Sequence, residues 1–197
     1  ESGLKVFHGL VMMMGVVVDN YRPGAVEGLG VDYDTLSKLN PRIICCSVTG
    51  FGASGPHRDR PAYDAIFQAL AGTMSVTGEP GGTPVLSGIP TDFGGSMYAL
   101  HGVLAALYAR ERTGLGQRVE VSLLDTVVSM LFLQAADYLV DGEVPGPVGS
   151  GHGIRGAPPY GAFKTKDDRY ITVAAHRNSY SNNCLNKQED LLRNPHF

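Results

Sequence analysis

Two short apolar runs with a helical segment between them constrain the fold of this 197-residue chain most strongly. Residues 16–19 and 42–48 are rich in Val, Ile and Cys, which is typical of buried strands. Residues 32–39 have helical spacing, with Asp32 in the position of an N-cap. A strand, a helical crossover and a second strand form a βαβ unit, so we predict that the two strands are parallel.

The rest of the sequence predicts more helices, a third strand and a hairpin. Helices are expected at 63–71, from Asp92 to Arg112, and from Ser122, as its cap, to about residue 140. A strand is expected at 117–121. Glycine and proline mark loops, and the alternating segments at 160–166 and 169–174 predict a β-hairpin that opens a second, smaller domain.

Composition and charge exclude several classes of protein. With 43% hydrophobic and 18% charged residues the chain is an ordinary globular sequence. The net charge of -3 and the scattered basic residues argue against a nucleic-acid partner. No apolar stretch reaches the ~20 residues that span a bilayer, and no signal peptide opens the chain, so we expect no membrane partner.

The cysteines indicate a reducing environment. Cys45 and Cys46 are neighbours in a predicted strand, so their side chains face opposite ways, and Cys184 is the third cysteine. This pattern predicts neither a disulfide framework nor a zinc site, and we expect no bound metal. A cytoplasm-like compartment fits best.

Asp92 stands at the start of the long helix and has two interpretations. Position alone favours an N-cap, because Asp accepts N–H groups of the first turn. Gly94 and Gly95, however, are poor helix formers, so their presence suggests that a ligand approaches the backbone closely. A helix N-terminus also has free N–H groups that can bind an oxyanion. Asp92 is therefore either a cap or a reactive carboxylate.

Other polar residues have weaker signals. Asn20, Tyr21 and Arg22 follow a strand directly, where ligands of α/β sheets bind, but they also fit a plain turn. Asp64 reads as a helix cap beside a half-buried Tyr63. Of the lone histidines, His101 is interpreted as a helix-core residue, and His57 and His152 as polar groups of loops.

The glycine-rich loop at 50–56 does not match a known nucleotide-binding pattern. It lacks the Gly-Lys-Ser/Thr ending of a P-loop and does not follow G-x-G-x-x-G. Ser54 has no G-x-S-x-G context, so a hydrolase triad has no support either.

Several motifs follow one another along the chain: Val17-Val-Asp-Asn-Tyr-Arg-Pro-Gly24, Leu39-Asn-Pro-Arg-Ile-Ile44, Ser47-Val-Thr-Gly-Phe-Gly52, Gly55-Pro56 with Arg60-Pro-Ala-Tyr-Asp64, and Leu104-Ala-Ala-Leu-Tyr-Ala-Arg-Glu-Arg-Thr-Gly-Leu-Gly-Gln117. Together, from about Val16 to Ala174, the chain resembles the class III CoA-transferase family, which includes formyl-CoA transferase, carnitine CoA-transferase and α-methylacyl-CoA racemase. The resemblance does not identify the member.

The resemblance implies a fold and an assembly. The expected fold class is α/β: a Rossmann-like open sheet with helices on both faces, plus the start of a smaller α+β domain. Residues 1–141 would form part of the large CoA-binding domain, without its N-terminal strand, residues 142–159 a linker, and residues 160–197 the beginning of the small domain. The family further implies an interlocked homodimer.

The resemblance also implies a reaction and the residues that perform it. Asp92 would be the nucleophile, passing CoA from an acyl-CoA donor to a carboxylic acid acceptor through an aspartyl anhydride and an aspartyl-CoA thioester. Gly94 and Gly95 would leave room for the thioester. Coenzyme A, as the acyl-CoA substrate, is the implied cofactor. Its expected contacts are Asn20, Tyr21, Arg22, Pro61, Ala62, Tyr63 and Asp64. A dicarboxylic acceptor is suggested by the segment 163–167.

Alternatives remain within this resemblance. Tyr63 occupies the place of the racemase's catalytic histidine, which favours transfer over epimerisation. A truncated, non-catalytic scaffold that oligomerises is the other alternative, because Gly28 replaces a CoA-holding arginine and the match fades beyond Ala175. We expect a fragment of a longer chain, cytoplasmic, or mitochondrial or peroxisomal in a eukaryote. As such a fragment, the 197-residue chain is expected to bind CoA weakly.

Overall fold

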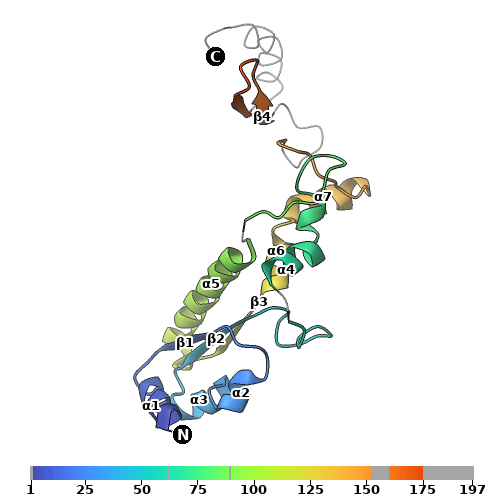
Figure 1. The fold of residues 1–197 in the computed structure, drawn as a ribbon. Helices are drawn as coiled ribbons and strands as arrows, with labels where there is room; N and C mark the ends of the chain where they lie inside the picture. The colour runs from blue at the N-terminus through green and yellow to red at the C-terminus, as the bar shows by residue number, and fades with distance from the viewer. Residues whose placement is uncertain (1, 62, 89, 152–159, 175–197) are drawn as a thin grey trace. The chain divides into compact units, whose positions relative to one another are not determined.

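The computed structural model describes residues 2–61, 63–88, 90–151 and 160–174 (Figure 1). They divide into two compact units. The first consists of Glu1–Gly72 and Gly88–Met130, and the second of Thr73–Ser87 and Leu131–Phe197. All sequence-predicted site residues that the structure describes belong to the first unit.

A parallel three-stranded sheet forms the centre of the first unit, in the order β1 (Val16–Asp19), β2 (Ile44–Thr49) and β3 (Arg118–Ser122). Val17 pairs with Cys45, and Cys45 with Arg118. The parallel pairing of the first two strands, predicted from the βαβ pattern, is therefore confirmed. β1 begins at Val16, as predicted, whereas β2 begins two residues later than predicted, at Ile44, and β3 one residue later, at Arg118.

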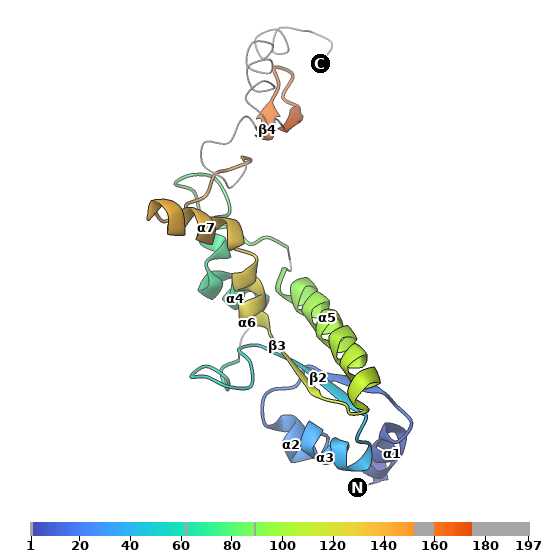
Figure 2. The same cartoon turned by 180° about the vertical axis from the view of Figure 1, so that it is seen from behind.

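Helices cover both faces of this sheet (Figures 1 and 2), as predicted. On one face lie α1 (Ser2–Val11), α2 (Ala25–Leu29) and α3 (Tyr33–Leu39), and on the other lies the long α5 (Pro90–Thr113). Cys45 packs with Val11, Leu36 and Ile43 on the first face. Cys46 packs with Ala99 and Val121 on the second. The two adjacent cysteines thus belong to separate cores, as their alternation predicted.

The N-cap of α3 is Asp32, as the sequence predicted. Its Oδ1 accepts the backbone N–H of Thr35 at 3.0 Å and its Oδ2 accepts the Thr35 hydroxyl at 2.7 Å. Burial alone raises the pKa of Asp32, but the hydrogen bonds from Thr35 outweigh it, so the net pKa lies below its ordinary value.

Two short helices, α4 (Asp64–Ala71) and α6 (Leu123–Ser129), lie side by side beyond the carboxyl ends of β2 and β3 (Figure 1). Ser122 caps α6 by accepting the N–H of Asp125 at 3.2 Å, as predicted. The prediction of one helix from Ser122 to residue 140 is wrong, because α6 ends at Ser129 and α7 (Phe132–Asp141) is separate. The Ser129 hydroxyl donates to the Thr126 carbonyl at 2.7 Å, a back-bond that competes with the helical ladder.

Gly116, just before β3, permits a close approach of two backbone segments. Its N–H donates to the Pro41 carbonyl at 2.8 Å. A Cβ atom at this position would overlap the carbonyl of Ile43. The second glycine of the Thr113-Gly-Leu-Gly-Gln117 motif is therefore a steric requirement of the sheet.

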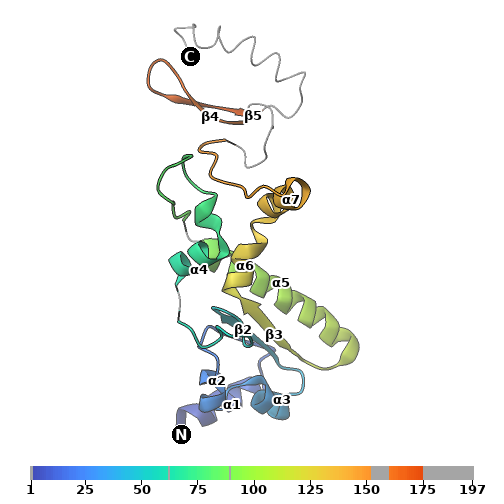
Figure 3. The same cartoon turned by 90° about the vertical axis from the view of Figure 1, so that its right-hand side faces the viewer.

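The second unit contains η1 (Thr73–Ser75), α7 and a hairpin of β4 (Tyr160–Lys164) with β5 (Tyr170–Ala174), seen in Figure 3. The predicted hairpin is confirmed. Its turn is fixed by Asp167, whose pKa is lowered to about 2 by hydrogen bonds from Thr165 and Arg169. The proposed linker at 142–159 stays a prediction, since residues 152–159 lie outside the described part of the chain.

Candidate active site

A cleft of about 400 Å³ opens at the carboxyl edge of the sheet, within the first unit. Its walls come from the turn after β1, the loop after β2, and the starts of α4, α5 and α6. Sequence-predicted site residues that line it are Asn20, Tyr21, Arg22, Pro61, Tyr63, Asp64 and Asp92. The structure therefore brings together residues that are separated by up to about 70 positions in the chain. Ala62 lies outside the described residues.

Asp92 is the third residue of α5, not its N-cap. The helix begins at Pro90, because proline has no N–H to lose and its fixed φ suits the first helical position. The side chain of Asp92 is exposed and faces the cleft, and its negative charge is stabilised by the N-terminal end of the helix dipole. Among the described residues no hydrogen bond to its carboxylate is found. An exposed carboxylate with both oxygens available can act as a nucleophile.

Asp64 lies at the start of α4, and its role also differs from the one that the sequence predicted. Tyr63 is the N-cap residue and is 84% exposed rather than half-buried, so Asp64 is not the cap of its own helix. Instead, its Oδ1 accepts the backbone N–H of Thr91, in the first turn of α5, at 3.1 Å. Its Oδ2 accepts the side-chain amide of Gln68 at 2.5 Å. Asp64 therefore joins the N-termini of α4 and α5.

The turn after β1 is held by two polar side chains. Asn20 donates from Nδ2 to the Val48 carbonyl at 2.6 Å, which fastens the end of β1 to β2. Asp19 accepts the Tyr21 N–H at 3.2 Å and the Ser47 hydroxyl at 2.7 Å. These bonds fix the backbone from which the exposed Arg22, a lining residue of the cleft, extends.

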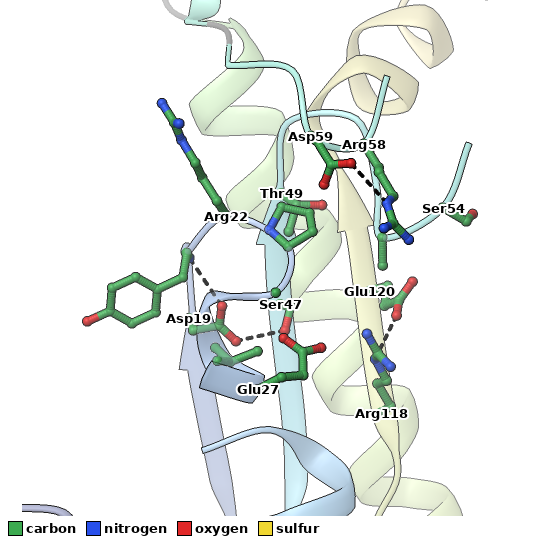
Figure 4. A pocket seen from close by; sticks show the side chains of 15 residues that line it. Asp19, Arg22, Glu27, Ser47, Thr49, Ser54, Arg58, Asp59, Arg118 and Glu120 are labelled. Atoms are coloured by element: carbon green, nitrogen blue, oxygen red, sulfur yellow. Dashed lines mark hydrogen bonds and ion pairs between the residues drawn. The ribbon is translucent and has the colours of Figure 1, made fainter. Parts of the chain in front are cut away.

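A second cleft, of about 600 Å³, adjoins the first on the α2 side of the sheet (Figure 4). Arg118 pairs with Glu120 at 2.6 Å, and Arg58 pairs with Asp59 at 3.2 Å. In Figure 4, Arg22 extends away from Asp19 and Ser47. The strand residues Arg118 and Glu120 were not among the sequence-predicted site residues. Their alternation in β3 places both on one face, which was the available signal.

A third cleft, of about 700 Å³, lies on the α5 side of the sheet and is mostly apolar. Val18, Ala99, Leu100 and Val103 contribute to its wall. Asp92 lines this cleft as well as the first one. The carboxylate therefore stands where a polar cleft that contains arginines meets an apolar one.

Gly94 and Gly95 are not among the residues that line these three clefts. Both are buried in the face of α5 that packs on α6. A Cβ at Gly94 would come within 2.6 Å of the Thr126 methyl, and one at Gly95 within 2.5 Å of Leu123. The glycines allow the close approach of two helices, and through it they set the position of the first turn of α5.

No histidine of the described part of the chain lines this cleft. His101 is exposed on α5 and bonds the Met97 carbonyl at 2.6 Å, so the helix-core interpretation is wrong. The small residues of α5 face the sheet, which leaves its larger side chains outside. His57 packs against Phe51, with ring centroids 5.7 Å apart, and His152 lies outside the described residues.

Comparison with known proteins decides the family. The family model described as CoA-transferase family III matches residues 1–197. The chain belongs to this family. Over its whole length it is 41% identical to an acyl-CoA transferase of Fusarium pseudograminearum, of which it covers 43%. It is 38% identical to the human succinyl-CoA:glutarate CoA-transferase, with 90% of this chain and 40% of that protein aligned.

Solved structures agree with this assignment. A CAIB/BAIF family protein from Brucella suis superposes on all of the chain with a TM-score of 0.81 and 31% identity, and 52% of that protein is covered. Rv3272 from Mycobacterium tuberculosis superposes with a TM-score of 0.76 and 29% identity, over 94% of this chain and 48% of that one. The chain thus spans about half the length of its structural relatives, and less than half of the curated ones.

Within the described residues of this CoA-transferase family member, no group of three or more His, Cys, Asp or Glu side chains could hold a metal ion. In the same residues no single helix has both the length and the apolar character to cross a membrane. Only the consecutive pair α6 and α7 together meets that test of length and composition.

Proposed function

We propose that this chain carries the nucleophile and the main CoA-binding cleft of a CoA-transferase, which moves CoA from an acyl-CoA donor to a carboxylic acid acceptor. One observation carries the proposal: Asp92 shares a cleft with Asn20, Tyr21 and Arg22 on one side and with Tyr63 and Asp64 on the other. These residues are the ones that the family resemblance assigns to CoA and to the reacting carboxylate.

Asp92 begins the proposed reaction. A carboxylate oxygen attacks the thioester carbonyl of acyl-CoA, the C–S bond breaks, and CoA leaves as a thiolate. The product is an acyl-aspartyl anhydride. The thiolate then attacks the aspartyl carbonyl, releases the donor's carboxylate and forms an aspartyl-CoA thioester. This division into steps is the usual gain of covalent catalysis.

The acceptor completes the cycle by the same chemistry. Its carboxylate attacks the aspartyl-CoA thioester, which expels the thiolate and forms a second anhydride. The thiolate attacks the acceptor's acyl carbon, and the carboxylate of Asp92 is regenerated. Water has to be excluded because it would hydrolyse the anhydrides. Free N–H groups in the first turn of α5 are suited to stabilise each tetrahedral oxyanion.

Arginines of the cleft are suited to the anionic parts of the substrates. Arg22, Arg58 and Arg60 line it, and a guanidinium binds phosphate or carboxylate through two parallel hydrogen bonds. Among the relatives are a succinyl-CoA:glutarate and an acetyl-CoA:oxalate CoA-transferase, whose names specify dicarboxylic acids. We therefore propose a dicarboxylic acceptor. We also propose a homodimer as the active assembly, because the family resemblance implies one. Tyr63, in the place of a histidine, argues against epimerisation.

Trapping of the intermediate tests the role of Asp92. The full-length protein is incubated with a panel of acyl-CoAs and hydroxylamine, digested, and analysed by mass spectrometry. A hydroxamate at Asp92 is expected with the correct donor, and Asp92→Ala is expected to lose transfer while it still binds CoA. Asp125→Asn is a matched control, because Asp125 is also an exposed third residue of a helix but does not line the three clefts. Full turnover of Asp92→Ala would refute the assignment.

A further inference from the structure

Gln68 is a fully buried polar residue next to the cleft, and no motif of the sequence singled it out. Its exposed fraction is 0%. Burying a side-chain amide is unfavourable unless the amide is hydrogen-bonded. Its Nε2 donates to Oδ2 of Asp64, one helical turn earlier in α4, at 2.5 Å. The amide therefore acts on a carboxylate that lines the cleft.

The position of this amide is fixed by the packing of α4. Phe67, the neighbour of Gln68, is buried and meets the ring of Phe51 edge to face, with centroids 5.2 Å apart. Gly50 leaves room for this ring, because a Cβ there would come within 2.9 Å of its Cζ. Consequently α4 is anchored to the end of β2, and Gln68 donates from a defined place.

Asp64 passes this constraint on to α5. One of its oxygens receives the amide of Gln68, and the other receives the N–H of Thr91. With a donor on each oxygen, the carboxylate plane cannot turn freely. Thr91 is itself fully buried, and its N–H is one of the first-turn donors that have no partner within a helix. The next residue along the chain is Asp92.

We propose that Gln68 is a positioning residue of the transfer reaction: through the Gln68–Asp64–Thr91 link it fixes the first turn of α5 and thereby the orientation of the Asp92 carboxylate. This inference rests on the proposed function of Asp92. Gln68 contacts neither substrate nor the reacting atoms in this scheme. Its effect is geometric, since a small misplacement of a reacting group can cost on the order of a hundredfold in rate.

Amide exchange tests the link without reference to activity. Gln68→Met removes the donor but keeps the length and most of the volume of the side chain. Hydrogen exchange of the Thr91 amide, followed by NMR in the full-length protein, is expected to be about tenfold or more faster in this variant, because helix ends without partners open locally. Leu36→Ala, in the core on the opposite face of the sheet, is the control for general destabilisation. Unchanged protection of Thr91 in Gln68→Met overturns the inference, whatever the activity.

Kinetics distinguishes positioning from mere stability. For Gln68→Met the expected result is a fall of about 10- to 100-fold in kcat per folded molecule, with KM for acyl-CoA within about threefold, and a parallel fall in hydroxamate formation at Asp92. Gln68→Asn, whose shorter amide keeps a donor, is expected to recover part of the rate. A kcat equal to wild type in Gln68→Met overturns the inference. Absence of any adduct at Asp92 in the wild type is a failure of the proposed function, and the exchange result still decides whether the link exists.

Discussion

The carboxylate of Asp64 accepts the backbone N–H of Thr91 at 3.1 Å, and so the first turn of one helix caps the first turn of another. The two residues are 27 positions apart, and the loops between them leave the first compact unit and return to it. This contact therefore ties the start of α4 to the start of α5, next to Asp92. Its loss should be measurable both in stability and in the geometry of the site.

Removal of the Asp64 carboxylate should destabilise the first unit. In Asp64→Ala the buried N–H of Thr91 has no acceptor, which costs about 1–3 kcal/mol of the free energy of unfolding. Asp64→Asn should lose less, because an amide oxygen can still accept. Urea unfolding measures both. Asp59→Ala is the control: Asp59 pairs with Arg58 on the surface with its side chain 73% exposed, so its removal should cost at most about 0.5 kcal/mol. Equal losses in Asp64→Ala and Asp59→Ala would contradict the role of Asp64.

Replacing Gly94 of α5 by alanine should lower the stability of the fold, although alanine has the higher helix propensity. Gly94→Ala gains up to about 1 kcal/mol of propensity. It also places a Cβ 2.6 Å from the Thr126 methyl and closer still to Met130, and such overpacking typically costs about 1–3 kcal/mol. We expect a net loss of stability, measured by urea unfolding.

Gly28 supplies the matched control for this prediction. It is a helical glycine with nothing within 4 Å of a Cβ, so Gly28→Ala should raise the free energy of unfolding by about 0.5–1 kcal/mol. If Gly94→Ala is as stable as Gly28→Ala, α5 and α6 do not pack as closely as described.

The sequence predicted the sheet well because its signals are local. The β-branched run of β1 and the Ile-Cys run of β2 indicated strands, and the helix between them required parallel pairing. The burial predicted for β1 is wrong, because β1 lies at the edge of the three-stranded sheet and its Val18 is 61% exposed. The cap of α3 was equally local, since Asp32 and Thr35 are only three residues apart. In the same way, the cleft residues after β1 were predictable from their place at the carboxyl end of a strand.

The start of α5 could not be read in this way. The predicted helix began at Asp92, which made an N-cap one of the two interpretations of that residue, whereas the helix begins at Pro90. The true acceptor for the first turn, Asp64, comes from another helix, and no local pattern announces such a contact. The burial of α5 was also misjudged for His101, because Gly94, Gly95, Ala99 and Ala106 face inward and allow the helix to approach its neighbours closely. The buried face of α5 therefore cannot be identified by looking for large apolar side chains.

Asp32 should give the fold an acid-sensitive contribution. Its pKa is lowered in the folded chain, so its stabilising effect is present above the unfolded pKa of about 3.9 and is lost as the pH falls through the lower native value. Asp32→Ala should cost about 1 kcal/mol at pH 7. The difference between wild type and Asp32→Ala should shrink below about pH 4, as measured by urea titrations at several pH values. Asp34→Ala is the control, because Asp34 is not the N-cap of α3, and a constant difference for Asp32→Ala would contradict the assignment.

The two buried thiols, Cys45 and Cys46, should make the stability of the fold depend on pH in the alkaline range. Burial raises the pKa of Cys45 to about 11, with a further contribution from Asp19 and Asp32, and burial and Asp19 also raise the pKa of Cys46. A thiol with a raised folded pKa favours the fold fully below its unfolded pKa of about 8.5, and this contribution is lost as the pH rises through the folded value.

Between the unfolded and the folded pKa of Cys45, the free energy of unfolding should therefore fall more steeply with pH in the wild type than in Cys45→Ala. At pH 7, however, Cys45→Ala should be the less stable protein, because it leaves a cavity in the core with Val11 and Leu36. Urea unfolding across this pH range measures the slopes. Alkylation by iodoacetamide, in a Cys184→Ser background, is an independent check. Cys45 and Cys46 should resist alkylation at pH 8 in the folded protein, because only an exposed thiolate reacts. Both should be alkylated once the protein is unfolded. Rapid alkylation of folded Cys45 would mean that its side of the sheet opens far more readily than the packing with Leu36 and Ile43 implies.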